Sequence, residues 1–515
     1  MSNWTDGYVV DIDYTHGYYR QLSPGLLSFA TLARGVGTRL QRPLRYLELG
    51  YGQGVSLAIH AAACEGEFWG TDFMPAHAAN ARELLDASGA DAHVFDQSFE
   101  EFAARTDLPE FDIICLHGIW AWVSAANRAV IVDLLRRKLA YGGMVYVSYN
   151  CAPGYTPVAP LRQLLNLHAD LAGNADAGVG GRIDAALDFA RTVAGSGAAF
   201  FEQNPFVATH LEKIGDYSRD YLAHEYFGGN WELMNFAQVC KLLAEAKLDF
   251  AASARLSDHV DALDVKPEGQ KFLAGVVHPV LRESVRDYLV NRRFRSDIFV
   301  KGARRLSPSQ QADLLMARCF MLTTAPADIG MTIDAPAGPF AMPAAICEPL
   351  VEILAADDFS PKSLEQIAAH PALRDVPLAA LVEVLLLLGA GAHVHFAQDA
   401  DVVERVDARC RKLNAFILDR ARYGAAIDCL ASPVTGGGIR LSRQEQMFLS
   451  VRALGHPEPQ SWAQFVWRHE GDHASQFRLT GTLSAASAQR MAELLSQAEN
   501  FATKRLPILQ ALRIA

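Results

Sequence analysis

Residues 45–56 read Arg45-Tyr-Leu-Glu-Leu-Gly-Tyr-Gly-Gln-Gly-Val-Ser56, and this stretch decides the fold of the chain. Its apolar first half predicts a buried strand, and the alanine-rich residues 55–63 after it predict a helix. Glycines at positions 50, 52 and 54 allow positive φ angles and a close approach of the backbone to a ligand. The unpaired N–H groups at the start of the helix face the same space. The stretch therefore predicts a strand, loop and helix that bind a carboxylate-bearing molecule.

Two kinds of nucleotide site share a glycine-rich loop of this type. A dinucleotide fingerprint requires G-x-G-x-x-G/A, and counting from Gly50 puts Val55 where the third small residue belongs. The spacing Glu48-x-Gly50-x-Gly52-x-Gly54 resembles instead the first motif of class I S-adenosylmethionine methyltransferases, whose loop lies against the amino-acid end of the cofactor. Such a loop also serves tight packing between a strand and a helix, so the neighbouring segments decide between these interpretations.

The next predicted strand, residues 67–73, ends in an acidic side chain. Asp72 follows Gly54 by eighteen residues, and a carboxylate at this place can accept both hydroxyl groups of a ribose. An acidic residue at the end of a strand can instead serve only as a cap for the following helix. Because Asp72 follows a glycine loop at this spacing, we favour the ribose contact.

Residues 93–99 predict a third strand, which ends in the polar side chains of Asp96, Gln97 and Ser98. These residue types are common in turns and helix caps. Their assignment to the adenine end of a cofactor therefore depends on the two preceding motifs.

Residues 111–118 and 143–149 predict two further strands, with a helix between them that ends at a pair of glycines. Alternating strands and helices predict an α/β fold with a parallel, Rossmann-like sheet and right-handed crossovers. Ligands of such sheets bind beyond the carboxyl ends of the strands. The glycine loop, Asp72, Asp96 and His117 all fall at such ends.

Length and composition limit the possible class of protein. A chain of 515 residues is too long for one ordinary core and predicts roughly three or four domains. It contains no run of eighteen apolar residues and no basic, apolar leader pattern at its N-terminus, so we expect a soluble cytoplasmic protein without a membrane segment. A net charge of −11 argues against nucleic acid as the main partner, because phosphate binding needs concentrated Lys and Arg.

Cysteines and basic residues show no special pattern. The 8 cysteines form no C-x-x-C pair and have no histidine at ligand spacing, so we expect reduced thiols, no disulfide and no metal. A basic run lies between Arg282 and Arg305, but acidic residues are interspersed within it. This mixture favours a solvated or salt-bridged helix.

Aromatic residues in two segments flank the predicted ligand site. Tyr14, Tyr18 and Tyr19 lie close together with a histidine and a glycine, which suits either a lid over a pocket or an N-terminal arm packed onto the domain. Trp120 and Trp122 follow the fourth strand. They either close the edge of the domain or place aromatic faces beside a cation, which cation–π attraction favours.

The remaining chain is less informative. Residues 220–231 hold four aromatic side chains around His224 and Glu225, which suits a structural corner or a wall of the substrate pocket. Residues 161–219 predict a helical insertion that covers a site or pairs two subunits. Three helices and a strand over residues 350–396 suggest a winged-helix-like module for protein contacts, and a helix over 484–504 would end or kink at Pro507.

Several of these segments together resemble the bacterial class I methyltransferases that carry a methyltransferase regulatory domain. The segments that carry the resemblance are residues 14–19, 48–54, 70–73, 116–120 and 146–150, and for the regulatory region residues 224–227 and 286–295. The best-known relatives are protein-lysine methyltransferases that modify outer-membrane surface proteins. The resemblance implies S-adenosyl-L-methionine as cofactor, a protein lysine as acceptor and a homodimer.

The resemblance also implies a division of the chain. We expect a catalytic domain over residues 1–260 with an insertion at 161–219 that pairs two subunits. A mixed α+β middle domain follows at 261–345, and a winged-helix-like C-terminal domain at 346–515. The two later domains would help to hold a large protein substrate.

The motifs assign two sets of site residues. The cofactor-binding set is Glu48, Gly50, Tyr51, Gly52, Gly54, Asp72, Phe73, Asp96, Gln97, Ser98 and His117. The catalytic set is Tyr14, Tyr18, Tyr19, His117, Trp120 and Trp122. The aromatic residues would form a slot for a lysine, with His117, a tyrosine hydroxyl or a carboxylate near the mouth accepting its proton. Two alternatives stay open: methylation of a small metabolite or natural product, and a cofactor-binding interaction module without catalysis.

Overall fold

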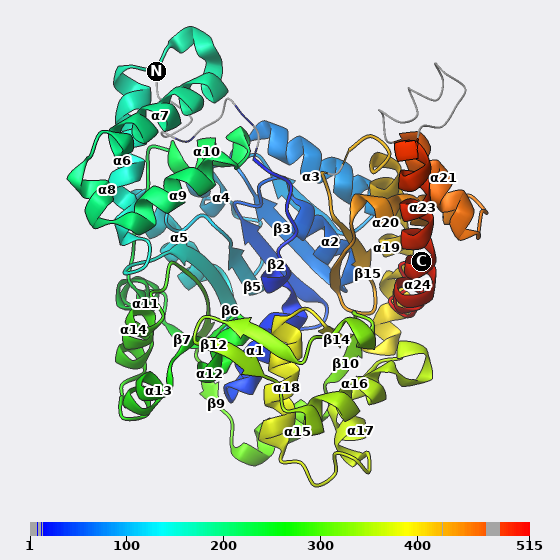
Figure 1. Ribbon diagram of the computed structural model, residues 1–515. Helices are drawn as coiled ribbons and strands as arrows, with labels where there is room; N and C mark the ends of the chain where they lie inside the picture. Colours follow the sequence, from blue (N-terminus) through cyan, green and yellow to red (C-terminus); the bar gives the residue numbers. More distant parts are fainter. Residues whose placement is uncertain (1–7, 9–11, 13, 425, 470–484) are drawn as a thin grey trace.

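A seven-stranded sheet with the order β4-β3-β2-β5-β6-β8-β7 lies at the centre of the molecule (Figure 1). The computed structural model describes all residues except 1–7, 9–11, 13, 425 and 470–484. The strands are β2 (Leu44–Leu49), β3 (Gly66–Thr71), β4 (Ala92–Phe95), β5 (Phe111–Leu116), β6 (Leu139–Asn150), β7 (Leu248–Ser253) and β8 (Phe294–Lys301). The predicted α/β class and the Rossmann-like sheet are confirmed.

The strand order creates a crevice at one edge of the sheet. β2 pairs in parallel with β3 on one side and with β5 on the other, and β3 and β5 pair in parallel with β4 and β6. The chain therefore moves outward from β2 in one direction and then crosses back to β5. The carboxyl ends of β2 and β5 form a topological switch point, which is where ligands of open α/β sheets bind.

Helices cover both faces of the sheet because successive strand residues point to opposite faces. Tyr46 and Phe68 lie in one apolar core, and their neighbours Leu47 and Trp69 lie in the other. The helices over the first face are α1 (Pro24–Ala33), α2 (Val55–Ala63) and α3 (Pro75–Ser88). Those over the second are α4 (Phe99–Ala103), α5 (Ala125–Lys138) and α11 (Phe236–Ala244).

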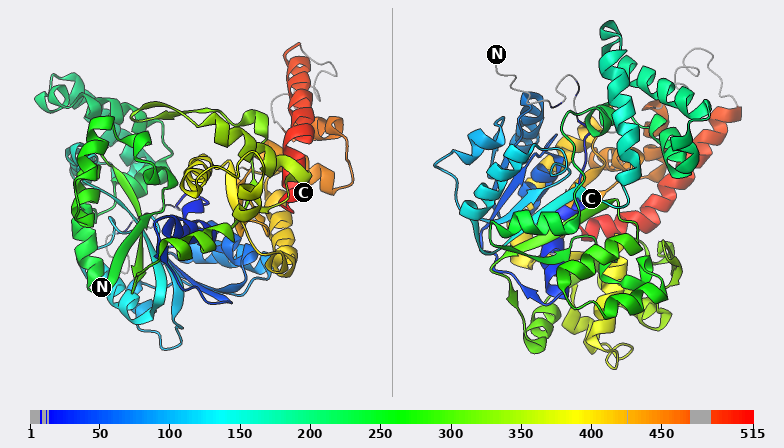
Figure 2. Two further views of the ribbon diagram at one scale, coloured as in Figure 1. Left: turned by 90° about the horizontal axis from the view of Figure 1, so that it is seen from below. Right: turned by 90° about the vertical axis from the view of Figure 1, so that its left-hand side faces the viewer.

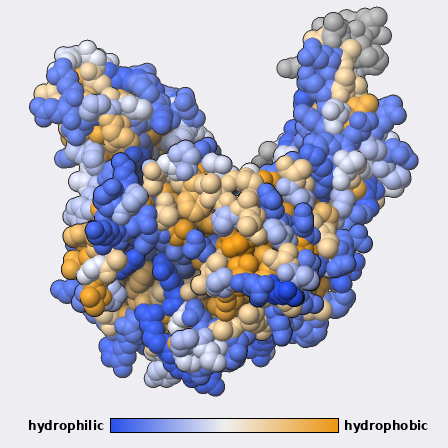
Figure 3. All heavy atoms as spheres, turned by 60° about the horizontal axis from the view of Figure 1, so that its bottom comes forward, coloured by the Kyte–Doolittle hydropathy of each residue, from blue (hydrophilic) through white to orange (hydrophobic). Residues whose placement is uncertain are grey.

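The segment after β6 forms a helical lobe with a small core of its own. Its helices are α6 (Ala159–Leu171), α7 (Gly178–Gly195), α8 (Ala199–Gln203) and α9 (Pro205–Gly215), followed by α10 (Arg219–Tyr226), which leads back toward the sheet. Figures 1 and 2 show this lobe projecting from the body on the side opposite the C-terminal helices. Seen from below in Figure 3, a wide hollow separates the two projections.

β8 corrects the predicted domain boundary at residue 260. It pairs antiparallel with both β6 and β7, so the chain as far as Lys301 completes the central sheet. Four arginines of the basic run around it form ion pairs: Arg282, Arg286, Arg292 and Arg295. Arg295 contacts Asp287 at 2.6 Å and Asp297 at 2.8 Å, and all three side chains are buried.

The C-terminal half contains the predicted succession of helices and a strand. The elements are α16 (Ala344–Phe359), β13 (Lys362–Ser363), α17 (Leu364–Ala369), α18 (Leu378–Ala390) and β14 (Val394–Ala397). The middle strand of their three-stranded sheet is β10 (Cys319–Leu322), between β13 and β14. The predicted C-terminal domain begins at residue 346, but β10, which belongs to its sheet, precedes that residue. The domain therefore begins earlier in the chain than predicted.

The last helices are α21 (Pro459–His469), α23 (Ala485–Asn500) and α24 (Leu506–Ala511), with a π-helical turn over residues 501–505. Residue 484, where the long helix was predicted to begin, lies outside the described residues. Pro507 stands in the first turn of α24, where its missing N–H is tolerated. Across the described residues, no helix has both the length and the apolarity to cross a membrane.

Candidate functional site

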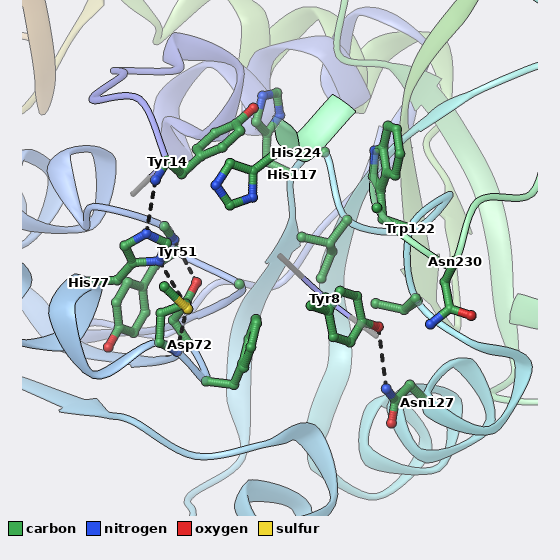
Figure 4. A pocket seen from close by; sticks show the side chains of 18 of the residues that line it. Tyr8, Tyr14, Tyr51, Asp72, His77, His117, Trp122, Asn127, His224 and Asn230 are labelled. Carbon is green, nitrogen blue, oxygen red and sulfur yellow. Dashed lines mark hydrogen bonds and ion pairs between the residues drawn. The ribbon is translucent and has the colours of Figure 1, made fainter. Parts of the chain in front are cut away.

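A cavity of about 840 Å³ opens beyond the carboxyl ends of β2, β3 and β5. Its walls come from the glycine loop, the ends of β3 and β4, the N-terminal segment, the turn after β5 and α10. Asp72 and His77 lie at one end of the cavity and Trp122 lies at the other (Figure 4). The cavity therefore occupies the switch point of the sheet.

The glycine loop has the backbone that its sequence predicts. Gly50, Gly52 and Gly54 have φ angles of +70°, +56° and +73°. A Cβ atom would lie 2.7 Å from a side-chain atom of Ile119 at Gly50, and 2.5 Å from Ala81 at Gly54. At Gly52 it would meet only the Tyr14 ring, at 3.6 Å. Two glycines thus allow close packing, and the middle one keeps the loop open toward the cavity.

Glu48 brings a carboxylate to the floor of the cavity at the end of β2. Its side chain is almost wholly buried, and Oε2 has no hydrogen-bond partner. Burial, together with the negative charge of Asp72, raises the pKa of Glu48 to about 8. A buried polar atom without a partner is unfavourable. This oxygen therefore fits a cationic ligand group, such as the ammonium of an amino-acid moiety.

Asp72 connects the glycine loop to the N-terminal segment. Its Oδ2 accepts a hydrogen bond from the Gly52 amide at 2.9 Å, and its Oδ1 contacts His77 Nδ1 at 3.1 Å. His77 Nε2 accepts a hydrogen bond from the Tyr14 amide at 3.2 Å, so the ring proton lies on Nδ1 and points to Asp72. Figure 4 shows this chain from the Tyr14 amide through His77 to Asp72. Asp72 Oδ1 also accepts from the Met74 amide at 3.1 Å, so a lone pair of Oδ2 is what remains for a ligand in the cavity.

The other residues of the predicted cofactor set lie in different surroundings. Tyr51, Phe73, Gln97 and Ser98 line the cavity. The Tyr51 hydroxyl donates to the carbonyl of Phe95, the last residue of β4, at 2.9 Å, and Ser98 caps α4 through a capping box. Ser98 is therefore both a helix cap and a cavity residue.

Asp96 is a correction to the predicted set. Its side chain is exposed and pairs with Arg82 of α3 at 3.2 Å, outside the cavity lining. The neighbouring Gln97 lines the cavity instead. Adjacent residues of an extended segment point in opposite directions, and the spacing of a motif cannot say which one faces the ligand.

The N-terminal segment crosses the cavity and is fixed at several points. Gln53 donates to the Tyr14 carbonyl at 3.0 Å, and Ser56 accepts from the Tyr19 amide at 2.9 Å. The Tyr14 hydroxyl donates to Glu225 Oε1 at 3.3 Å. Tyr14 and Tyr19 therefore cover the cavity between α2 and α10.

Tyr18 and Trp120 correct the predicted catalytic set, because neither lines the cavity. The Tyr18 hydroxyl contacts His60 Nε2 at 3.2 Å, and its ring packs against the backbone of Gly438. Trp120 has 0% exposure and belongs to the core on the α5 face of the sheet. Trp122, two residues later, does line the cavity. In both segments the sequence pattern indicates that aromatic residues lie near the site, but it does not indicate which of their side chains point into the cavity.

His117 lies between the cofactor loop and the aromatic residues. Its ring packs against that of Tyr19, tilted by 37°, with ring centres 3.9 Å apart. Its Nδ1 contacts the Tyr146 hydroxyl at 2.9 Å and Ser148 Oγ at 3.2 Å. Burial lowers the pKa of His117 to about 4, so the ring is neutral at neutral pH. Its contacts fix the ring in place, and its low pKa makes it a weak proton acceptor.

Several cavity residues were not in the predicted sets. They are Tyr8, Asn127, Asn150, Tyr155, Tyr221, His224, Glu225, Asn230 and Phe294. Two sequence signals indicate part of this group: Asn150 stands at the end of the predicted fifth strand, where it could supply a polar group to the pocket, and aromatic residues cluster around His224 and Glu225, which suits a structural or a substrate role. No cluster of His, Cys, Asp or Glu suited to a metal ion occurs within the described part of the chain.

Comparisons with known proteins agree with this geometry. Residues 218–301 match a family described as a predicted methyltransferase regulatory domain. The chain is 34% identical over 515 residues to the uncharacterized protein sll1526 of Synechocystis sp., covering 99% of this chain and 100% of that protein. PKMT2 from Rickettsia typhi in complex with AdoHcy has the same fold, with a TM-score of 0.67 at 16% identity over 94% of this chain and 98% of that one. The chain belongs to the same family as sll1526, contains a predicted methyltransferase regulatory domain and has the fold of a class I S-adenosylmethionine-dependent methyltransferase.

A second structure of PKMT2 from Rickettsia typhi gives a TM-score of 0.64 at 16% identity, over 95% of this chain and 98% of that one. The shared fold thus extends over nearly the whole chain. The matched regulatory region, residues 218–301, includes α10 and β8. Through Tyr221, His224, Glu225 and Phe294 it forms part of the cavity wall. The matched regulatory region is therefore continuous with the candidate active site.

Proposed function

We propose that this methyltransferase transfers the methyl group of S-adenosylmethionine to the side-chain amine of a lysine in a protein. The observation that carries the proposal is the division of the cavity into two unlike halves. The half at the glycine loop is polar and ends in the unpartnered Oε2 of Glu48. The other half is aromatic, with Tyr19 and Trp122 in its walls, and Tyr14 connects the halves, because its ring faces Gly52 and its hydroxyl donates to Glu225.

The polar half suits the cofactor. Glu48 would hold the ammonium group of the methionine moiety, and the open face at Gly52 would lie against the same moiety. Asp72 would accept from the ribose hydroxyls, with Gln97 and Ser98 toward the adenine. When bound, the cofactor supplies an activated methyl group on a positively charged sulfur.

The aromatic half suits a lysine side chain. The aliphatic stem of lysine can pack along aromatic rings, and its charged head is attracted to their faces. His117 and Tyr19 pack against each other at the junction of the two halves and would align the acceptor with the methyl group. Alignment and exclusion of water are the main demands of such a transfer.

We further propose that two subunits pair through the helical lobe. Leu167 and Leu171 on α6 are 53% and 78% exposed, and Phe189 on α7 is 42% exposed. Large apolar side chains exposed on neighbouring helices favour a contact between protein surfaces.

Incubation with methyl-labelled S-adenosylmethionine and fractionated cell lysate tests the acceptor. We expect label on protein, and methyl-lysine after hydrolysis of that protein. A Glu48→Ala variant serves as the control with an impaired cofactor site. Label on small molecules would favour a metabolite acceptor, and cofactor binding without any transfer would favour an interaction module.

A further inference from the structure

Glu225 places a single carboxylate in the aromatic half of the cavity. Four carboxylates line the cavity as a whole: those of Glu48, Asp72, Glu100 and Glu225. Glu48 and Asp72 stand at strand ends on the cofactor side, and Glu100 stands in the first turn of α4. Glu225 comes from α10, in the regulatory region, and is surrounded by phenol groups from the N-terminal segment, the turn before α6 and α10 itself. These are the hydroxyls of Tyr14, Tyr19, Tyr155, Tyr221 and Tyr226.

No cation neutralises this carboxylate within the described chain. Its hydrogen bond from the Tyr14 hydroxyl is long, at 3.3 Å. The nearest facing charge is Arg162 of α6, which donates to the Gly228 carbonyl and lies 4.9 Å over the Trp231 ring, outside ion-pair distance of Glu225. Burial raises the pKa of Glu225 to about 7, and the Tyr14 hydroxyl and Arg162 partly oppose that rise. A cationic ligand could therefore supply the missing positive charge beside Glu225.

Other groups near the acceptor site are poor proton acceptors. His117 has a pKa of about 4, and its Nδ1 is engaged by Tyr146 and Ser148. His224 contacts the Ile12 carbonyl through Nε2 at 2.9 Å, and burial lowers its pKa. The phenols that line this half have raised pKa values and hold their protons at neutral pH. Glu225 is the group in this half that can both attract a cation and take up a proton.

We infer that Glu225 binds the cationic nitrogen of the methyl acceptor and removes its proton, which makes a primary amine the substrate class of this site. This inference rests on the proposed function. The ammonium proton passes to a carboxylate oxygen of Glu225 and leaves a lone pair on nitrogen. That lone pair forms the new N–C bond as the S–CH₃ bond breaks, and the electron pair of the broken bond stays on sulfur. The proton then leaves Glu225 for solvent.

A Glu225→Gln variant tests this assignment. Glutamine keeps the size of the side chain and an oxygen that accepts from Tyr14, so the variant removes the charge with little change of shape. The matched control is Asp220→Asn, which removes an exposed carboxylate from the first turn of the same helix. The measurements are AdoHcy affinity by calorimetry and the rate of transfer to the protein fraction that the wild type labels.

We expect AdoHcy affinity within twofold of wild type for both variants. The kcat of Glu225→Gln should fall about 100-fold or more, as for loss of a group that transfers a proton in the reaction. The wild-type rate should rise with pH through about 7, and this rise should be absent in Glu225→Gln. In Tyr14→Phe the rise should move to higher pH, because the hydroxyl that lowers the pKa of Glu225 is gone.

A second measurement separates this inference from the proposed function. Saturation-transfer NMR with n-butylammonium and, as neutral control, 1-butanol reports on the cation site in AdoHcy-loaded protein without any transfer. We expect n-butylammonium binding in the wild type and Asp220→Asn, and at least tenfold weaker binding in Glu225→Gln. Wild-type transfer with an equally active Glu225→Gln would overturn the role of Glu225. If the wild type labels no protein, the proposed function fails, and the NMR result alone decides whether Glu225 binds amines.

Discussion

Replacing Glu48 by glutamine tests the polar end of the cavity through the stability of the ligand-free protein. Burial and the charge of Asp72 raise the pKa of Glu48 from its ordinary value of 4.5 to about 8. Each pKa unit corresponds to 1.36 kcal/mol, so ionised Glu48 destabilises the ligand-free fold by at most about 5 kcal/mol. Glutamine keeps the shape of the side chain and has no such charge.

The sign of the effect follows from the direction of the shift. Between pH 4.5 and about 8 the unfolded chain has lost the Glu48 proton, while the folded protein still holds it. The folded state therefore binds more protons in this range, and the stability contributed by Glu48 falls as pH rises, levelling off above about 8. The melting temperature of Glu48→Gln should exceed that of wild type by a margin that grows from pH 5.5 to pH 8.5.

Differential scanning calorimetry of the ligand-free proteins at pH 5.5, 7.0 and 8.5 measures this margin. Glu202→Gln is the control, because it makes the same chemical change at an exposed position in α8. With saturating AdoHcy at pH 8.5 the order should change, since the ligand ammonium compensates the wild-type charge and has no charged partner in the variant. A margin that does not change with pH, or an equal gain from AdoHcy in both proteins, would refute the role given to Glu48.

Four further variants test other residues. Asp72→Ala should weaken AdoHcy binding by about 1.5–3 kcal/mol through loss of a charged hydrogen-bond acceptor, and unchanged affinity in calorimetry would reject the ribose contact. Trp120→Ala should lower the free energy of unfolding by about 3–5 kcal/mol because the ring is fully buried in the core. Trp122→Ala should instead lower turnover with AdoHcy affinity retained, and the two variants can be compared by denaturant unfolding and kinetics. Leu171→Asp should yield monomers in light scattering if the helical lobe pairs subunits, whereas an unchanged mass would exclude this contact.

The sequence predicted the glycine loop and the sheet because their signals are local. The spacing of Gly50, Gly52 and Gly54 after an apolar run specifies a turn that few other residues can form. Asp72 could be predicted because it ends a predicted strand, and the carboxyl ends of parallel strands meet at one edge of the sheet. These features need no knowledge of distant parts of the chain.

The errors and omissions concern side-chain direction and distant contacts. Trp120 and Trp122 follow the same strand, but one packs into the core and the other faces the cavity. Glu225 is more than one hundred residues beyond the loop in sequence and reaches the cavity only because α10 leads back from the helical lobe. β8 was assigned to a middle domain because its antiparallel pairing with β6 is set by the whole sheet. Each of these depends on tertiary packing, which periodicity does not encode.

Helix α2 connects the glycine loop at one of its ends to the C-terminal half of the chain at the other. The last carbonyl groups of a helix lack partners within it, and three side chains from the C-terminal half supply donors at the end of α2. Gln398 donates to Ala63 at 2.8 Å, Arg409 to Cys64 at 2.9 Å, and Cys410 to Ala62 at 3.4 Å. The guanidinium of Arg409 also suits the negative end of the helix dipole. Because the glycine loop lies at the other end of the same short helix, the C-terminal half helps to set the position of the loop. A change in the packing of the C-terminal half on α2 would therefore change the position of the glycine loop.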